Sequence, residues 1–184
     1  HADDTRETRL RAAYRFKGSG FERVQFYGAT GNAQDAGAYD IIVLRGVDPE
    51  APFDVSATTA TGIDGHAADP PSITPATQGA WTFHVGASAC ATGAKHTSSD
   101  LSDFLSSTQA DTNDVNLGAG LLSKGWSSGA QDPAAFGGGG SGTTTDSWAA
   151  FSVAFRPFIE VSAAGAPADI QFEGTASTFL AQFP

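Results

Sequence analysis

The stretch that decides the fold is WAAFSVAFRP at residues 148–157, and a similar stretch, YDIIVLRG, occupies residues 39–46. Both are rich in β-branched or aromatic residues, and both end in arginine followed by glycine or proline. Short apolar runs bounded by such chain breakers are typical of buried strands. We therefore predict a buried strand at each stretch, with residues 39–44 central in a sheet because they are apolar on both faces.

The composition favours the same class of structure. Charged residues make up 16% of the 184 residues, below the usual ~25%, while the chain contains 22 glycines and many serines and threonines. This composition is typical of strands joined by turns and is poor in helix-forming residues. The single cysteine, Cys90, excludes an intrachain disulfide, so the hydrophobic core must hold the fold together.

Local patterns predict further short strands, separated by loops. Residues 58–77 are predicted to be a loop because they contain three prolines, and residues 101–105 are predicted to form a helical turn capped near Ser98. The remaining predicted strands are 12–16, 21–27, 53–55, 80–88, 115–122, 158–161 and 170–172.

This organisation predicts an all-β fold. About nine short strands with long polar loops favour an antiparallel β-sandwich of the jelly-roll or lectin-like type, with a closed barrel as the weaker alternative. We expect one domain over residues 1–184, with a polar arm at 1–11 and a Gly/Thr-rich loop at 137–146.

The charge balance restricts the partners. Twenty acidic against ten basic residues leave a formal net charge of −10, and this charge repels phosphate backbones and anionic membrane surfaces. No apolar run is long enough to cross a bilayer as a helix. We therefore expect neither nucleic-acid binding nor membrane insertion.

Two motif matches do not support an enzyme. Residues 125–129, GWSSG, match the nucleophile-elbow pattern, but no helix is predicted after them and no histidine follows His96. The glycine run at 137–142 precedes a strand instead of a helix, so it lacks the phosphate-binding context. The chain is therefore predicted not to be an enzyme.

One cluster of side-chain oxygens could hold a cation. Asp111, Asn113 and Asp114 lie close together in sequence, and calcium prefers such oxygen ligands. The spacing does not fit an EF-hand loop, and a turn stabilised by Asx hydrogen bonds is the alternative. No other cofactor is predicted.

Two aromatic residues could bind sugars. Trp126, flanked by serine and glycine, and Tyr27, at the end of a predicted strand, could stack on sugar rings, or could instead plug loops onto the core.

An amino-terminal histidine can bind copper together with a second histidine, and His1 suggests this chemistry. Its candidate partners are His66, His84 and His96. A secreted polysaccharide-active protein, either a carbohydrate-binding module or a copper oxygenase using His1, is therefore the alternative function.

Several motifs recur in the same order in a known group of proteins. They are the strand ending in RGVD at 45–48, PFDV at 52–55, PSIT at 71–74 and SWAAFSVAFRP at 147–157. With these motifs, residues 38–157 resemble β-sandwich structural proteins of tailed phages, prophages and gene transfer agents. Leu44 replaces the tyrosine that is usual before the arginine.

The resemblance implies a virion structural protein, such as a tail, fibre, head-spike or decoration component. It further implies a location in the virion or outside the cell, other virion proteins as partners, a homo-oligomer, and adhesion to a host-surface polysaccharide. Its motifs are structural, so no catalytic residue is carried over. We expect Arg45 and Arg156 to pair with nearby carboxylates such as Asp48 or Glu160, or to cap loop carbonyls.

Overall fold

The computed structural model describes residues 8–19, 38–63, 67–89, 95–109, 115–123, 125–138 and 147–159. Within these ranges the chain forms antiparallel strands and contains no helix. The described residues therefore include no helix that could span a membrane. The all-β prediction is confirmed. The strands are β1 (Phe53–Gly62), β2 (Trp81–Ala89), β3 (His96–Thr97), β4 (Ser102–Gln109), β5 (Val115–Ser123), β6 (Gly137–Gly138) and β7 (Trp148–Phe155).

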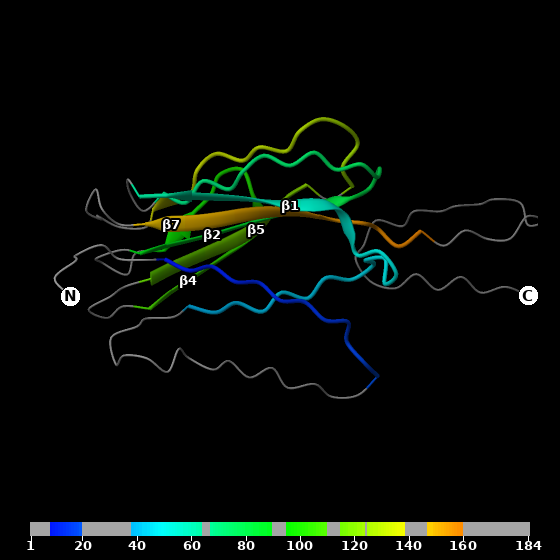
Figure 1. Ribbon diagram of the computed structural model, residues 1–184, viewed down its shortest axis with the longest axis horizontal. Helices are drawn as coiled ribbons and strands as arrows, with labels where there is room; N and C mark the ends of the chain where they lie inside the picture. Colours follow the sequence, from blue (N-terminus) through cyan, green and yellow to red (C-terminus); the bar gives the residue numbers. More distant parts are fainter. Residues whose placement is uncertain are drawn as a thin grey trace, which may run out of the picture.

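Five of these strands form the main sheet, in the order β1-β7-β2-β5-β4 (Figure 1), while β3 and β6 form a separate pair. Strand β7 is hydrogen-bonded to β1 on one side and to β2 on the other. In the second of these pairings, His84 lies opposite Ser152 and Phe83 lies opposite Val153. The prediction of a buried strand at residues 148–155 is therefore confirmed.

Several local predictions are wrong. Residues 12–16, predicted to be a strand, belong to no strand of the described sheets. Residues 39–44 form an extended segment that joins no strand of the described sheets, although their composition resembles that of β7. Residues 58–62 belong to β1, because the prolines that suggested a loop begin only at residue 70. Residues 102–105 belong to β4, where pairing with β5 overrides the local signal for a helical turn.

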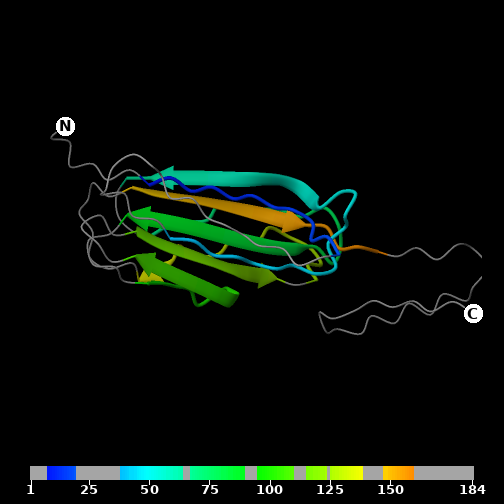
Figure 2. The same ribbon diagram turned by 90° about the horizontal axis from the view of Figure 1, so that it is seen from below.

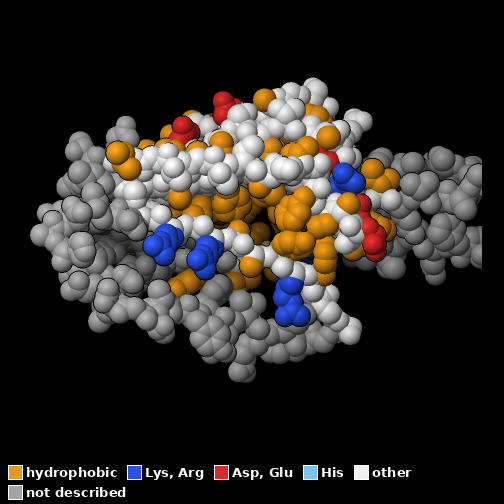
Figure 3. Space-filling model, in the orientation of Figure 1, with side chains coloured by type: hydrophobic (Ala, Val, Ile, Leu, Met, Phe, Trp, Pro, Cys, Tyr) orange, Lys and Arg blue, Asp and Glu red, His pale blue; other side chains and the backbone are white. Residues whose placement is uncertain are grey.

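One face of the main sheet is apolar. Its buried cluster consists of Phe83, Val85, Ala87 and Val153. The extended segments 8–19 and 38–45 run along this face (Figures 1 and 2), and Leu10 and Ala38 pack against the cluster. Apolar side chains remain visible in the hollow between the sheet and these segments (Figure 3).

The opposite face carries polar and small side chains and is covered by two loops, 67–80 and 125–138 (Figure 1). The loops are tied to each other by paired backbone bonds between Ile73 and Gln131, at 2.9 and 2.8 Å. Phe136 and Ala68 pack over Gly86, where an added Cβ would lie 2.6 Å from the Ala68 Cβ. A side chain at position 86 would therefore separate the loops from the sheet.

The predicted ends of the domain are described only in part. From the predicted polar arm, Thr8 donates its backbone N–H to the Ser147 hydroxyl and its own hydroxyl to the Ser147 carbonyl, each at 2.7 Å. Gly137 and Gly138, expected in a loop, form β6 against His96 and Thr97. Residues 139–146 lie outside the described residues.

Candidate functional site

The RGVD, PFDV and RP motifs of the sequence meet at one end of the main sheet. Val47 forms an isolated antiparallel bridge with Pro157. The backbone N–H of Arg156 donates to the Pro52 carbonyl, and the Arg156 carbonyl accepts from the backbone N–H of Asp48, both at 3.0 Å. Segments that are about a hundred residues apart in the sequence therefore adjoin at the end of β7.

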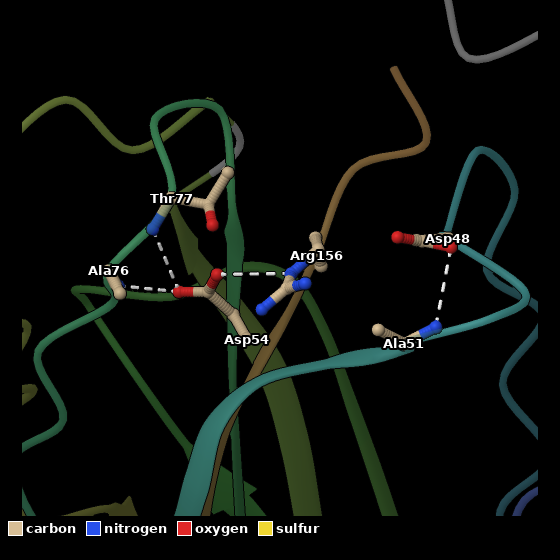
Figure 4. A network of polar contacts seen from close by, with 6 residues as sticks. All are labelled: Asp48, Ala51, Asp54, Ala76, Thr77 and Arg156. Carbon is tan, nitrogen blue, oxygen red and sulfur yellow. Dashed lines mark hydrogen bonds and ion pairs between the residues drawn. The ribbon is translucent and has the colours of Figure 1, made fainter. Parts of the chain in front are cut away.

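Asp54 is the centre of this arrangement, which we call the Asp54 clamp: Asp54, Ala76, Thr77 and Arg156 (Figure 4). One carboxylate oxygen of Asp54 accepts the backbone N–H groups of Ala76, at 2.5 Å, and Thr77, at 3.1 Å. The other oxygen lies 3.7 Å from Nε of Arg156, an ion pair that is too long for a hydrogen bond. The clamp therefore fastens the loop before β2 to β1 and to the end of β7.

The environment of Asp54 keeps it ionised. Burial raises the pKa of this carboxyl, but hydrogen bonds from Thr77 and Ala76 and the charge of Arg156 together outweigh burial and lower it below its usual value. Because the carboxylate is the form that accepts these bonds, the clamp is intact at neutral pH.

The expected partners of the arginines are corrected here. Arg156 pairs with Asp54, not with Asp48, because Asp48 turns its carboxylate to the backbone N–H groups of Glu50 at 2.9 Å and Ala51 at 3.3 Å. Asp48 therefore closes an Asx turn. Glu160 lies outside the described residues.

A buried histidine–serine pair joins the middle of the sheet to the covering loop. Nδ1 of His84 lies 2.7 Å from the Ser152 hydroxyl, which donates to the Pro71 carbonyl. A hydroxyl has one proton to donate, so the bond between His84 and Ser152 requires a proton on Nδ1. The remaining nitrogen, Nε2, is buried without a hydrogen-bond partner among the described atoms.

The same histidine is held neutral. Its side chain is 0% exposed, and burial lowers its pKa to about 4. A catalytic dyad needs access to substrate, and this pair has none. His84 and Ser152 therefore connect β2, β7 and the loop at Pro71.

A second buried pair lies on the same face. The Ser88 hydroxyl is 3.0 Å from Nε2 of His96, whose ring contacts Phe136 edge-on with the centroids 5.6 Å apart. Because Ser88 is on β2 and His96 is on β3, this pair fastens the small sheet to the main one.

The structure explains the GWSSG match as a turn. Gly125 and Gly129 have positive φ angles of 72° and 86°, which other residues rarely adopt. Between them, Trp126 is only 9% exposed and donates its indole N–H to the Gly129 carbonyl at 2.7 Å. Trp126 thus packs its loop onto the core. This is the alternative to sugar stacking that the sequence analysis gave for this residue.

An open depression of about 490 Å³ lies where β1 and β7 meet the segment at residue 8. It is lined by hydroxyls, one cation and an indole: Thr8, Arg9, Thr61, Gly62, Ile63, Ser147 and Trp148. The Trp148 ring lies over Gly62, where an added Cβ would come within 2.5 Å of it.

Several predicted site residues lie outside the described residues: Tyr27, Asp111, Asn113, Asp114, His1 and His66. The calcium and copper predictions therefore stay predictions. Two of the candidate copper partners of His1, His84 and His96, are described, and both are buried. Among the described residues no group of three or more His, Cys, Asp or Glu side chains is arranged to hold a metal.

Sequence reasoning missed the Asp54 clamp and the pair of His84 with Ser152. One signal was available, because Ser152 is a polar residue inside an otherwise apolar strand. The partner across the sheet could not be named without the register of β2 and β7.

Comparison with known proteins assigns no family. No protein-family model, curated protein or solved structure matches this chain.

Proposed function

We propose that the chain is a non-enzymatic structural protein of the virion of a tailed phage or phage-like particle, serving in the tail, a fibre, or a head spike or decoration. One observation carries the proposal: the motifs that resemble this group of proteins form a mechanical clamp. RGVD, PFDV and the RP after β7 meet through the backbone bonds of Arg156 and its ion pair with Asp54.

The polar groups of the described core support the same proposal. Asp54, His84 and Ser88 each connect a strand to a loop or to a neighbouring strand. Each of these three side chains makes at least one hydrogen bond within the fold and acts as a fastening. A protein that bears load in a particle needs such fastenings between layers, whereas a catalytic group needs access to substrate.

The jelly-roll sandwich belongs to the proposal. In it, segments 8–19 and 38–45 are parts of the second layer, facing the apolar side of the main sheet. Their position along that face supports this arrangement (Figure 2). The proposal includes self-assembly, because the second layer leaves apolar residues exposed.

Adhesion to a host-surface polysaccharide is the second part of the proposal. The depression beside Trp148 supports it, because hydroxyls and an indole edge are groups that bind sugars. A glycan array probed with the wild-type chain and with Arg9→Ala tests it. Binding that is weakened by the substitution is expected, and an array without any hit contradicts this part alone.

The deciding experiment asks where the chain is found. We expect mass spectrometry of density-purified particles to detect it at a fixed stoichiometry, and immunogold labelling to place it on the particle. Its absence from particles, together with stoichiometric copper binding that is abolished by His1→Ala, would establish the alternative of a secreted polysaccharide-active protein.

A further inference from the structure

Buried polar side chains of β2 lie under the covering loops, and one of them can titrate. Thr82, His84 and Ser88 occupy alternate positions of the strand, so they share the loop-covered face, and each is 0% exposed. Of these three side chains, only the imidazole of His84 can take up a proton between about pH 4 and pH 8. A fall in pH therefore acts on this part of the face through His84.

The neighbours of His84 in the sheet engage only one of its ring nitrogens. In the register of the strands, His84 lies between Ser152 of β7 and Gly120 of β5. The serine hydroxyl is 2.7 Å from Nδ1, whereas Gly120 has no side chain that could reach the ring. Since Nδ1 carries the proton of the neutral ring, a second proton would bind at Nε2, which is buried without a hydrogen-bond partner among the described atoms.

The elements packed around His84 carry little charge. Strands β2, β5 and β7 contain no Asp, Glu, Lys or Arg, and the two covering loops contribute the carboxylates of Asp69 and Asp132, which are exposed. Asp54 on β1 is engaged in the Asp54 clamp, and His96 is bonded to Ser88. Among the described residues, none of these groups pairs with His84, and burial alone lowers its pKa.

Protonation of the closed structure would therefore leave a charged ring with a buried N–H group and no acceptor for it. Water can solvate Nε2 only if the cover moves off the sheet. Burial lowers the pKa of His84 to about 4, whereas a ring in water titrates near 6.5. Below about pH 6.5 an opened form takes up a proton that the closed form excludes, so acid favours opening.

The covering segment that is attached to His84 is the part of loop 67–80 around Pro71. The Ser152 hydroxyl accepts from His84 and donates to the Pro71 carbonyl. We call these three residues the His84 latch. Beside it, the Thr58 hydroxyl donates to the Ser72 carbonyl at 3.2 Å, but this bond is exposed and water can replace it. The latch therefore provides the shielded hydrogen bond that holds the middle of this loop to the sheet.

The other bonds of the two covering loops allow them to move together. Ile73 and Gln131 are paired through their backbones, and Phe136 donates its backbone N–H to the Ala68 carbonyl at 2.8 Å. These bonds join one loop to the other and do not involve the sheet. The Asp54 clamp holds the end of loop 67–80, and because the pKa of Asp54 is lowered from 3.8, the clamp stays ionised while His84 titrates.

We propose that the His84 latch is an acid-sensitive conformational device: protonation of His84 lifts loops 67–80 and 125–138 off the face of β2, while the five-stranded sheet stays intact. The loops open from the end that the Asp54 clamp holds in place. Opening exposes Phe136 and Ala68, which are 0% exposed in the closed form. The inference goes beyond the proposed function, because it concerns the response of the fold to acid and does not depend on where the chain is located.

Amide hydrogen exchange of the full chain tests this inference, measured by NMR between about pH 7 and pH 4.5 and corrected for intrinsic exchange rates. The reporters are the loop N–H groups of Ile73, Gln131 and Phe136, which are hydrogen-bonded in the closed form. We expect their opening equilibrium to rise about tenfold per pH unit below about pH 6.5, because opening takes up one proton. The amides of β2 should exchange more slowly than these reporters at every pH. Equal protection of loops and β2 would show that the loops open only when the whole domain unfolds, and this result overturns the inference.

Two variants assign the effect to His84. His84→Asn removes the titrating ring and is expected to lose the tenfold rise per pH unit. Thr82→Val is the matched control, because Thr82 is buried on the same face of β2 and does not titrate, so this variant should keep the wild-type profile. A rise that persists in His84→Asn, or one that is lost in Thr82→Val, contradicts the inference.

Nitrogen NMR shifts of the His84 ring in the wild type provide a check that needs no variant. At pH 7 we expect a neutral ring with its proton on Nδ1. A proton on Nε2 at this pH overturns the inference. A charged ring at lower pH, with the loop amides still protected, overturns it as well.

Discussion

Strand β7 lies between β1 and β2 and is hydrogen-bonded along both edges, whereas residues 38–45 run along the sheet without joining its described strands. The two stretches are alike in length and apolar content, and both end in arginine and a chain breaker. In β7, Ala150, Ser152 and Val153 are buried, while Ile41 and Val43 are exposed.

The difference shows that an apolar sequence favours burial of its side chains but does not determine which part of the protein, or which other molecule, buries them. For β7 the cover comes from the same chain: the apolar cluster on one side and the loop at Pro71 on the other. For residues 38–45 the sheet covers one side only. The same pattern can therefore produce a core strand or a partly exposed segment.

The largest expected effect separates the two stretches directly. Val153 is 4% exposed, and Val153→Asp would bury a carboxylate without a partner, so we expect a loss of more than about 4 kcal/mol in the free energy of unfolding. Val43→Asp, measured in dilute solution, should change it by less than about 0.5 kcal/mol. Urea denaturation measures both. Equal losses would show that residues 38–45 are core after all.

The second largest expected effect is a dependence of the free energy of unfolding on pH. It arises from His84, which is bonded to Ser152 of β7. The pKa of His84 is lowered to about 4 in the fold, while the unfolded state titrates near 6.5. The unfolded state therefore takes up a proton first as the pH falls, and stability present above pH 6.5 is lost progressively down to about pH 4. The expected loss is about 3 kcal/mol.

Urea denaturation between pH 8 and pH 4 measures this loss, with His84→Asn as the control. The variant should depend less on pH over this window than the wild type, because the contribution of His84 is removed. Asp54, whose pKa is lowered from 3.8, contributes stability above that value and loses it only at lower pH, so its titration falls below the window of His84. An unchanged slope in His84→Asn would contradict the assignment.

The smallest effect compares the two arginines. Arg156→Ala removes an ion pair to Asp54 that is 3.7 Å long and partly exposed, so we expect a loss of about 1 kcal/mol. A double-mutant cycle with Asp54→Asn isolates the pair from the two backbone bonds of Asp54. Arg45→Ala should leave the free energy of unfolding of the monomer unchanged within about 0.5 kcal/mol. A larger loss at Arg45 would place it in a structural pair.

Much of the sheet follows from local patterns. The strand at 148–155, the strand at 80–88 and the glycine-broken strand at 115–122 agree with β7, β2 and β5, because their apolar or alternating residues suit a pleated, buried surface. β4 was mistaken for a helical turn, since the pairing with β5 that stabilises it is not a local property.

The site was less predictable than the sheet. Trp126 was named as a candidate for sugar stacking or for a loop plug, and only its burial and its bond to Gly129 distinguish the two. In the sequence, Asp54 stands within the PFDV motif, and no local pattern indicates its partners. Its role depends on Thr77 and Arg156, which come near it only when the chain folds.

The amino-acid sequence alone establishes an acidic, all-β chain without disulfides, because charge, turn residues and side-chain alternation are properties of composition and local order. The tertiary structure decides which of two similar apolar stretches enters the sheet. That choice depends on the register of β2 against β7 and on the loops that cover it, which are contacts between residues far apart in the chain.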